Sequence, residues 1–244
     1  FPDGGEGWWT DRNKGGNGTF AVSPDQNWGW GYQILPYIEM NNVWEEPDDN
    51  ICRAALIRLY FCPSRRQPMR VQDPRYNNSG NPPGSGMIDY AGNAGTSTAE
   101  PSSGCKGNGF DGTVIRRADP TNSNRCGVIN LAASFPNGTS SIILVGEKVM
   151  NDALLGQNEP EDDQGYIDGW DWDIARWGDE QPQQDFKDKN QQVNRYAFGS
   201  AHTVSFNAVF CDGSVRRVRY TVPINILKMA TIRTGDQVYG FDDL

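Results

Sequence analysis

The sequence predicts an α+β fold, in which short helices pack on an antiparallel β-sheet and long loops connect the elements. Residues 201–222 and 141–149 have strand patterns, whereas residues 28–44, 51–60 and 224–234 have helical ones. The chain contains 28 glycines and 15 prolines, which is typical of a protein with many turns. With 244 residues it is long enough for one sizeable core, and we expect a single domain over residues 1–244.

Residues 201–222 carry the clearest strand pattern. Four apolar side chains share one face of the first strand: Val204, Phe206, Ala208 and Phe210. Asp212-Gly213 follows, a dipeptide that favours a tight type I′ turn because both of its central positions need a positive φ. The return strand places three apolar residues on one face: Val218, Tyr220 and Val222. We therefore expect a hairpin near the centre of the sheet, with Asp212 and Gly213 as its structural turn.

The other elements follow in chain order. Residues 28–44 indicate one or two helical turns interrupted at Pro36, and residues 51–60 indicate a second short helix. Short strands are expected at residues 87–92, 113–115 and 127–129. The run at 141–149 is apolar between turns, as in a strand buried on both faces. A C-terminal helix is expected at 224–234, with Gly235 just past its end.

Charge and cysteine content narrow the functional classes. The net charge is −9, and no basic stripe is present, so nucleic acid is excluded as a partner. Cys52 and Cys62 bracket one short segment, and Cys105 and Cys126 bracket another, which makes each pair a candidate disulfide of an oxidising compartment. Cys211 is left over as a small strand residue. No CxxC pair occurs, which argues against a zinc site.

Residues 152–194 form an acidic, tryptophan-rich insertion that we expect at an edge of the sheet. Closely spaced carboxylates repel one another unless a cation or an arginine, here Arg176, neutralises them. Calcium prefers oxygen ligands and is the candidate cofactor, with these candidate ligands: Asp162, Asp163, Asp168, Asp171 and Asp173. A solvated acidic loop without a metal is the alternative.

The same insertion offers a candidate glycan site. If residues 170–173 are extended, Trp170 and Trp172 share one face, and with Trp177 they would provide aromatic surfaces for stacking on a sugar. The alternative is that these tryptophans cover a thin core.

Two further polar residues have structural interpretations. His202 is the only histidine, and without a second histidine or a nucleophile motif beside it we interpret it as a hydrogen-bonded residue at a strand entry. Glu147 lies in the apolar run at 141–149, where an unpaired carboxylate is costly. We expect it to pair with Arg216, Arg217 or Arg219; a general acid is the alternative.

Several stretches, in the same order along the chain, resemble one family. They are WGWGYQILPYIEMNNVW, FCPSRR, DYAGNAG, GTSSIILVGEK, GWDWDIARWG, the His202-x9-Asp212-Gly213 spacing and LKMATIRTGDQV. Together they are similar to the planctomycete prepilin-like proteins of unknown function. Members of that family begin with a prepilin leader and a long apolar helix that runs into a Phe-Pro pair, which Phe1-Pro2 matches.

The resemblance implies the head of a pilin-like or pseudopilin-like subunit that lacks its N-terminal helix. Such a subunit would be non-enzymatic and extracellular or on the cell surface, anchored in a membrane before assembly. Its partners would be copies of itself or other pilin-like subunits, joined through that helix, and polysaccharide is a further candidate partner. The alternatives are a carbohydrate-binding module acting on its own and a glycan-active hydrolase.

Overall fold

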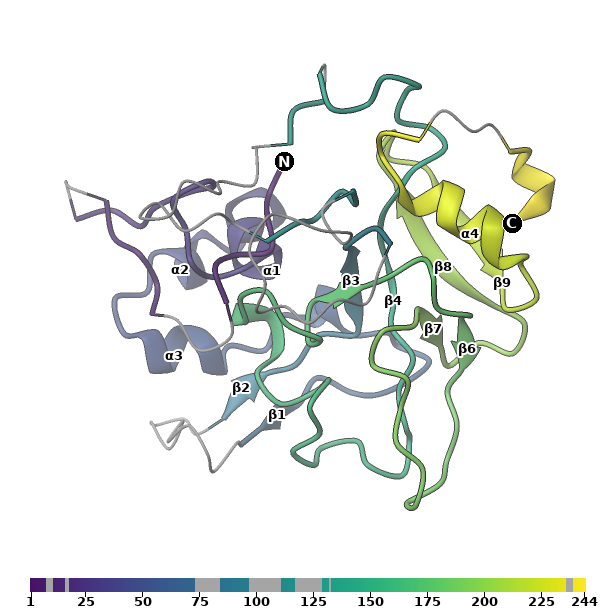
Figure 1. The fold of residues 1–244 in the computed structure, drawn as a ribbon. Helices are drawn as coiled ribbons and strands as arrows, with labels where there is room; N and C mark the ends of the chain where they lie inside the picture. The colour runs from purple at the N-terminus through teal and green to yellow at the C-terminus, as the bar shows by residue number, and fades with distance from the viewer. Residues whose placement is uncertain are drawn as a thin grey trace.

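The computed structural model describes residues 1–7, 11–15, 18–72, 84–96, 111–116, 129–131, 133–235 and 239–244. It confirms the α+β class: short helices from the N-terminal part lie on one side of a mostly antiparallel sheet, and the C-terminal helix lies on the other side, against the hairpin (Figure 1). None of the helices in the described part of the chain combines the length and apolar character needed to cross a membrane.

The N-terminal region is a series of short helical turns, as its interrupted pattern predicts. Helix α1 ends at Gln33, and Pro36 lies in the first turn of the 3-10 helix η1 that follows. The Asp48 side chain accepts the Asn50 N–H at 2.8 Å to begin α3. Helix α3 is shorter than predicted, and a separate turn, η2, precedes Phe61. The bounds are α1 Trp30–Gln33, η1 Leu35–Ile38, α2 Asn41–Trp44, α3 Asp49–Ala54 and η2 Arg58–Tyr60.

Within the described residues the main sheet has five strands in the order β5-β3-β4-β8-β9. All neighbours pair antiparallel except β3 and β5, which are parallel. The bounds are β3 Tyr90–Asn93, β4 Ile143–Glu147, β5 Ala175–Arg176, β8 Ser205–Phe210 and β9 Val215–Arg219. Strand β4 is central, and its apolar side chains contact clusters on both sides of the sheet, as the run at 141–149 predicts.

The predicted hairpin is confirmed as β8–β9, with Ser205 opposite Arg219 and Val209 opposite Val215. It lies at the edge of the sheet rather than at its centre, because β9 is an outer strand. Its loop has four residues instead of two: Gly213 alone has a positive φ, of 86°, and the Asp212 carboxylate accepts the Ser214 N–H at 2.9 Å. The turn is therefore not type I′.

Smaller elements complete the fold. Two two-stranded sheets pair β1 with β2 and β6 with β7. The expected strand at 113–115 is absent, and of residues 127–129 only Ile129 is described, outside any strand. Helix α4 ends at Thr231, so Gly235 is not its cap. The bounds are β1 Arg70–Val71, β2 Ser85–Gly86, η4 Gly165–Ile167, β6 Gln183–Gln184, β7 Gly199–Ser200, α4 Ile224–Thr231 and η5 Phe241–Asp243.

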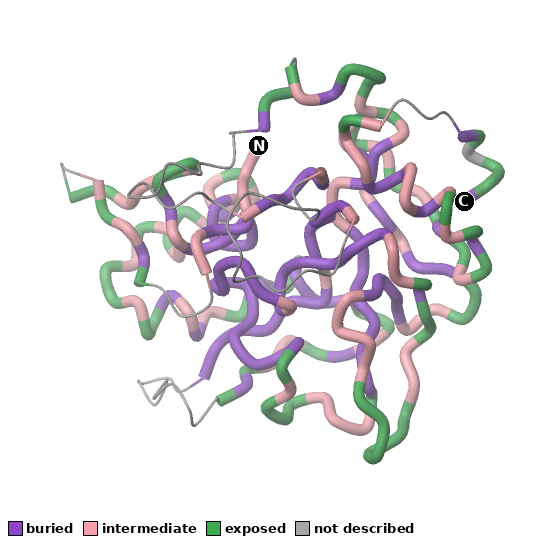
Figure 2. The backbone as a smooth tube through the Cα atoms, in the orientation of Figure 1, coloured by how far each residue is buried: buried purple, intermediate pink, exposed green. Residues whose placement is uncertain are grey.

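Two large apolar clusters occupy the interior. One joins the N-terminal helices to η4 and includes Trp28, Tyr32 and Tyr166. The other joins the hairpin to α4 and includes Phe206 and Leu227. Figure 2 shows buried backbone running through the centre of the molecule between them, with exposed backbone along the rim. The polar residues of interest lie in this central zone.

Candidate functional site

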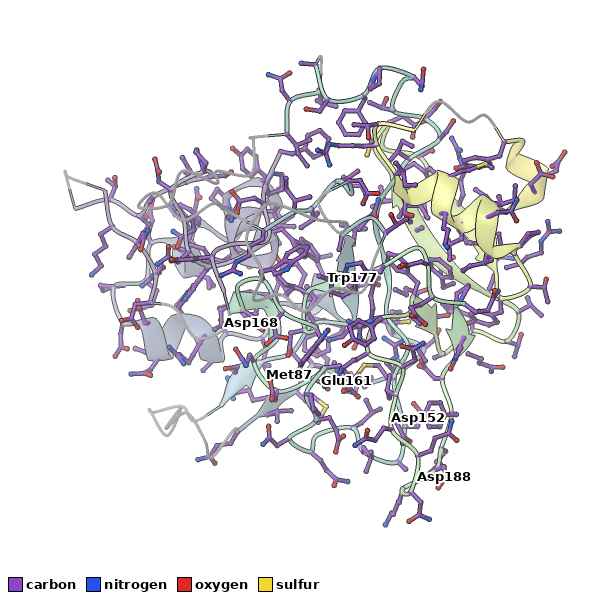
Figure 3. All side chains as sticks on the ribbon, viewed as in Figure 1. Met87, Asp152, Glu161, Asp168, Trp177 and Asp188 are labelled. Atoms are coloured by element: carbon purple, nitrogen blue, oxygen red, sulfur yellow. The ribbon has the colours of Figure 1, made fainter. Side chains whose placement is uncertain are left out.

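The acidic insertion is not an appendage at the sheet edge, because its middle part enters the core. Figure 3 shows Glu161, Asp168 and Trp177 in the centre of the molecule, whereas Asp152 and Asp188 lie on protruding loops. Residues 161–171 are all buried, and β5, which follows shortly after, is a strand of the main sheet. The segment therefore fills the space between the helices and the sheet.

Asp162 is neutralised by basic residues from other parts of the chain. Arg66 Nη2 donates to Asp162 Oδ1 at 2.8 Å, Arg66 Nη1 donates to Oδ2, and Lys148 Nζ lies 3.6 Å from Oδ1. Burial acts to raise the pKa of Asp162, but the charge and hydrogen bonds of Arg66 outweigh it and lower that pKa. Asp162 is thus one half of a buried ion pair.

The two consecutive arginines before β1 connect this pair to further carboxylates. Arg66 Nε donates to Asp89 at 2.8 Å, and Arg65 Nε donates to Asp185 at 2.7 Å, with Arg65 Nη1 3.5 Å from Asp89. All these side chains are almost completely buried. Asp162 lies at the start of the buried residues, and Asp185 lies after β5. The network therefore holds the chain on both sides of this segment beside β3, to which Asp89 is adjacent.

Asp173 stabilises a turn. Its carboxylate accepts the N–H of Gly165 at 2.7 Å and of Gln164 at 3.3 Å, at the start of η4. The fully buried Lys148 ammonium donates to the main-chain carbonyls of Glu161 at 2.7 Å and of Asp173 at 3.0 Å. Burial is the main cause that lowers the pKa of Lys148.

Asp168 and Asp171 are buried, and no basic side chain among the described residues forms a hydrogen bond or ion pair with either. Neither carboxylate oxygen of Asp168 has a hydrogen-bond partner within the described residues. Burial, followed by the charges of Asp171 and Asp173, raises the pKa of Asp168 well above its ordinary value. Burial and then Asp173 raise the pKa of Asp171 to about 7. These two side chains therefore favour the protonated form in the folded protein.

The aspartates do not form a preassembled calcium cage. No three of their oxygens lie within 4.8 Å of one another, although all five predicted ligands are among the described residues. Arg66 and Lys148 supply the positive charge that the sequence assigned to calcium or to Arg176. Arg176 is buried and donates instead to main-chain carbonyls, including that of Ala197 at 2.9 Å. Calcium binding stays a prediction.

The tryptophans of the segment mostly belong to the core. Trp170 and Trp177 are only 3% and 1% exposed, and their rings meet edge to face with centroids 5.9 Å apart. Residues 170–173 form a turn, so Trp170 and Trp172 do not share the face of a strand. Trp172 is half-buried, and the Arg195 guanidinium lies 3.8 Å from the centre of its ring. No pair of open rings is left here for a sugar.

A second group of polar side chains, which we call the Cys-Glu-His cluster, joins Cys62, Glu147 and His202. One ligand atom from each lies within 4.8 Å of the other two, and this is the one such group of three or more His, Cys, Asp and Glu among the described residues. His202 Nε2 is 3.3 Å from Glu147 Oε1 and 4.0 Å from Cys62 Sγ. Sequence reasoning assigned these residues to three unrelated structural roles.

Each member of the cluster comes from a different element. Cys62 follows η2, and its N–H is accepted by Asp89 Oδ2 at 2.8 Å. Glu147 is the last residue of β4, and its Oε2 accepts the main-chain and side-chain N–H groups of Asn207 on β8 at 2.7 and 3.1 Å. The His202 N–H is accepted by Ser200 Oγ at 3.1 Å. The pairing of β4 with β8 therefore brings the Glu147 carboxylate close to His202, which lies just before β8.

These contacts correct two expectations. Glu147 pairs with His202 and not with an arginine of β9; Arg216 instead contacts Asp212, with Nη2 and Oδ2 3.3 Å apart. Cys52 and Cys62 are both free thiols, because Cys52 is held in the helical region, with its Sγ 3.3 Å from the Val43 carbonyl. Burial raises the pKa of the Cys62 thiol. Cys105 and Cys126 lie outside the described residues.

A comparison with known families gives a match over most of the chain. Residues 3–225 match the family SBP_bac_10, described as "Protein of unknown function (DUF1559)". The chain belongs to the DUF1559 family. No curated protein and no solved structure matches it.

The stretches that carry the family resemblance in this DUF1559 chain supply the buried polar groups. FCPSRR provides Cys62 with Arg65 and Arg66, GTSSIILVGEK provides Glu147, and His202 opens the His-x9-Asp-Gly spacing. DYAGNAG contributes Asp89 to the ion-pair network, and GWDWDIARWG contributes Asp173, whose carboxylate accepts the Gly165 N–H. The signal that could have predicted the cluster was therefore present: three separate motifs, each with one side chain able to bind a metal.

Proposed function

We propose that the protein is the head of a non-enzymatic, pilin-like structural subunit exposed at the cell surface or outside the cell. The resemblance of its motifs to the planctomycete prepilin-like proteins supports this proposal, as does its α+β fold with a terminal antiparallel hairpin. The proposal includes membrane anchoring before assembly, as the resemblance implies.

One observation carries the non-enzymatic part of the proposal: the acidic and aromatic side chains of the insertion's middle part are mostly buried inside the fold. Asp162 is paired with Arg66, Asp173 accepts main-chain N–H groups, and Trp170 and Trp177 pack against each other. A catalytic carboxylate pair or a sugar platform needs such groups to face an open cleft. Here they fix the segment to the sheet, so the proposal does not include glycan binding.

The partners in this proposal are copies of the same subunit or other pilin-like subunits. The outer strand β9 disfavours association by sheet extension, since three of its five residues are arginines, and charged edges discourage pairing with another strand. Assembly through an apolar N-terminal helix, as the resemblance implies, is therefore the mode we propose.

Localisation and imaging of the complete gene product, produced in its native cell and detected with an antibody to the head, test this proposal. We expect the protein in the membrane or extracellular fraction and in fibres or assemblies seen by electron microscopy. Residues 1–244 alone, as the matched control, should elute as a monomer in size-exclusion chromatography. A complete product found only as a cytoplasmic monomer contradicts the proposal.

A further inference from the structure

The Cys-Glu-His cluster has the residue types of both a nucleophilic triad and a metal site, and its geometry separates the two. In a triad the nucleophile faces one ring nitrogen of the histidine while the carboxylate holds the other. In this protein Cys62 Sγ and Glu147 Oε1 both face the same atom, His202 Nε2. Three ligand atoms close to one another are the arrangement of a metal site, whereas a catalytic triad needs its nucleophile and carboxylate at different ring nitrogens.

The separations are close to those around a tetrahedral zinc ion. Bonds of about 2.1 Å to nitrogen and oxygen and about 2.3 Å to sulfur place N and O about 3.4 Å apart and S and N about 3.6 Å apart. The observed values are 3.3 Å for Nε2–Oε1 and 4.0 Å for Nε2–Sγ. The third separation, Cys62 Sγ to Glu147 Oε1, is within 4.8 Å, so an adjustment of the side chains would bring all three atoms to zinc-bonding distance.

We propose that Cys62, Glu147 and His202 bind one divalent ion of the zinc class, with water completing the coordination. A thiolate and an imidazole select zinc over calcium or magnesium, which take oxygen ligands. The ionised thiol and carboxylate with a neutral imidazole carry two negative charges, which the ion balances. This site is additional to the assembly role proposed above and does not depend on it.

The surroundings of the cluster position the ligands for this role. Glu147 is 1% exposed, and Asn207 occupies its Oε2, which leaves Oε1 for the ion. Such hydrogen bonds to a ligating carboxylate orient it and tune its affinity. The His202 side chain is 35% exposed, so solvent reaches the histidine side of the site. This exposed side leaves room for the water that completes the coordination of a site with three protein ligands.

Titration of residues 1–244, purified and treated with chelator, tests the proposal with Zn²⁺ and Co²⁺ as the probes. We expect one Zn²⁺ bound per chain at submicromolar concentration, measured by calorimetry in competition with a chelator. Bound Co²⁺ should give a thiolate-to-cobalt charge-transfer band in the near ultraviolet. Cys62→Ser should abolish that band, and Cys62→Ser and His202→Ala should each weaken Zn²⁺ binding by at least about 100-fold.

Cys211→Ser is the matched control, because Cys211 is a free, half-buried thiol outside the cluster. It should keep both the band and the affinity. Circular dichroism of each variant establishes that it is folded, and His202→Ala, at a half-buried position, serves if Cys62→Ser does not fold. Absence of Zn²⁺ binding at micromolar concentration overturns the proposal. So does a cobalt band that persists in Cys62→Ser, since the metal would then be held by other thiols.

Discussion

The hairpin β8–β9 and the buried segment 161–178 differ in where the information for their structure lies. In the hairpin, Phe206, Ala208 and Phe210 alternate with more exposed residues, and the partner strand follows after four residues. In the buried segment, acidic residues enter the core, and their partners Arg66 and Lys148 come from distant parts of the chain. One structure can be predicted from a local pattern, and the other depends on pairing across the fold.

This difference shows why a high density of charge does not by itself indicate a solvated loop. Burying an ionised carboxylate is costly unless a partner and hydrogen bonds satisfy it. Arg66, in FCPSRR, lies 96 residues before Asp162 in the sequence. Lys148, in VGEK, lies 14 residues before it (162 − 148). The comparison predicts that substitutions in the buried segment lower the free energy of unfolding strongly, and that substitutions at the hairpin turn lower it only slightly.

The largest effect is expected for Asp162→Asn. The substitution keeps the shape of the side chain but leaves Arg66 and Lys148 buried without this carboxylate. Breaking a buried ion pair in this way costs about 3–5 kcal/mol. The free energy of unfolding from urea denaturation measures the loss. Asp152→Asn, an exposed position in the same insertion, is the control and should change stability by less than about 0.5 kcal/mol. Equal effects of the two substitutions would contradict the role of the ion pair.

The second effect concerns pH. In the folded protein the pKa values of Asp171 and Glu161 are each raised to about 7, mainly by burial, and that of Asp168 is raised well above its ordinary value. A carboxyl group with a raised pKa in the folded protein binds its proton more tightly there than in the unfolded chain. Its contribution to the free energy of unfolding is therefore complete below the ordinary carboxyl pKa, and it is lost as the pH rises through about 7.

The free energy of unfolding should therefore fall between about pH 4.5 and pH 7.5, by an amount on the order of a few kcal/mol. Urea denaturation at a series of pH values measures the slope. Asp171→Asn, which keeps an oxygen to accept the Trp172 N–H, should make the slope shallower, whereas the exposed Asp188→Asn should leave it unchanged. A stability that rises with pH over this range in the wild type would contradict the buried, neutral state of these carboxyl groups.

A smaller effect is expected at the hairpin turn. Gly213 has a φ of 86°, and a Cβ atom built there meets nothing within 4 Å, so Gly213→Ala introduces backbone strain alone. We expect a loss of about 1 kcal/mol in thermal or urea denaturation. Gly213→Asn should lose less, because asparagine tolerates the left-handed region better than alanine does. If alanine and asparagine are equally harmless, the turn does not hold this conformation in solution.

Calcium is expected to have the smallest effect. Because Arg66 and Lys148 already neutralise Asp162, and because the aspartate oxygens do not converge, added calcium has little unbalanced charge to bind. Millimolar CaCl₂ should leave the melting temperature within about 1 °C of its value in chelator, which corresponds to a few tenths of a kcal/mol. A rise of several degrees that disappears in Asp168→Asn would instead support the calcium site that the sequence predicts.

The elements that could be predicted from the sequence are those with a local period. The hairpin, the β4 run and the interrupted helices around Pro36 were confirmed for this reason. The position of the hairpin at the sheet edge was not predicted, since strand order depends on which segments return to pair. The short parallel strand β5 was missed as well, because two residues are too few for any pattern.

The Cys-Glu-His cluster could not be predicted from spacing, because its three members are 85 and 55 residues apart (147 − 62 and 202 − 147). The absence of a CxxC pair argued against zinc, but that spacing is needed only when two ligands come from one turn. Here one ligand comes from a loop, one from the end of a strand and one from the entry to the next strand of the sheet. The pairing of β4 with β8 brings Glu147 and His202 together, and the hydrogen bond from the Cys62 N–H to Asp89 fixes Cys62 beside them.

Arg65 forms an ion pair with Asp185, and its neighbour Arg66 forms one with Asp162. Two adjacent residues therefore fix both ends of the segment 162–185. A protease that cuts the exposed stretch 187–192 would leave both contacts inside the N-terminal piece, and the pairing of β8 with β4 would hold the C-terminal piece to it. Such a clipped molecule should migrate as a single particle under native conditions and separate into two bands only in detergent.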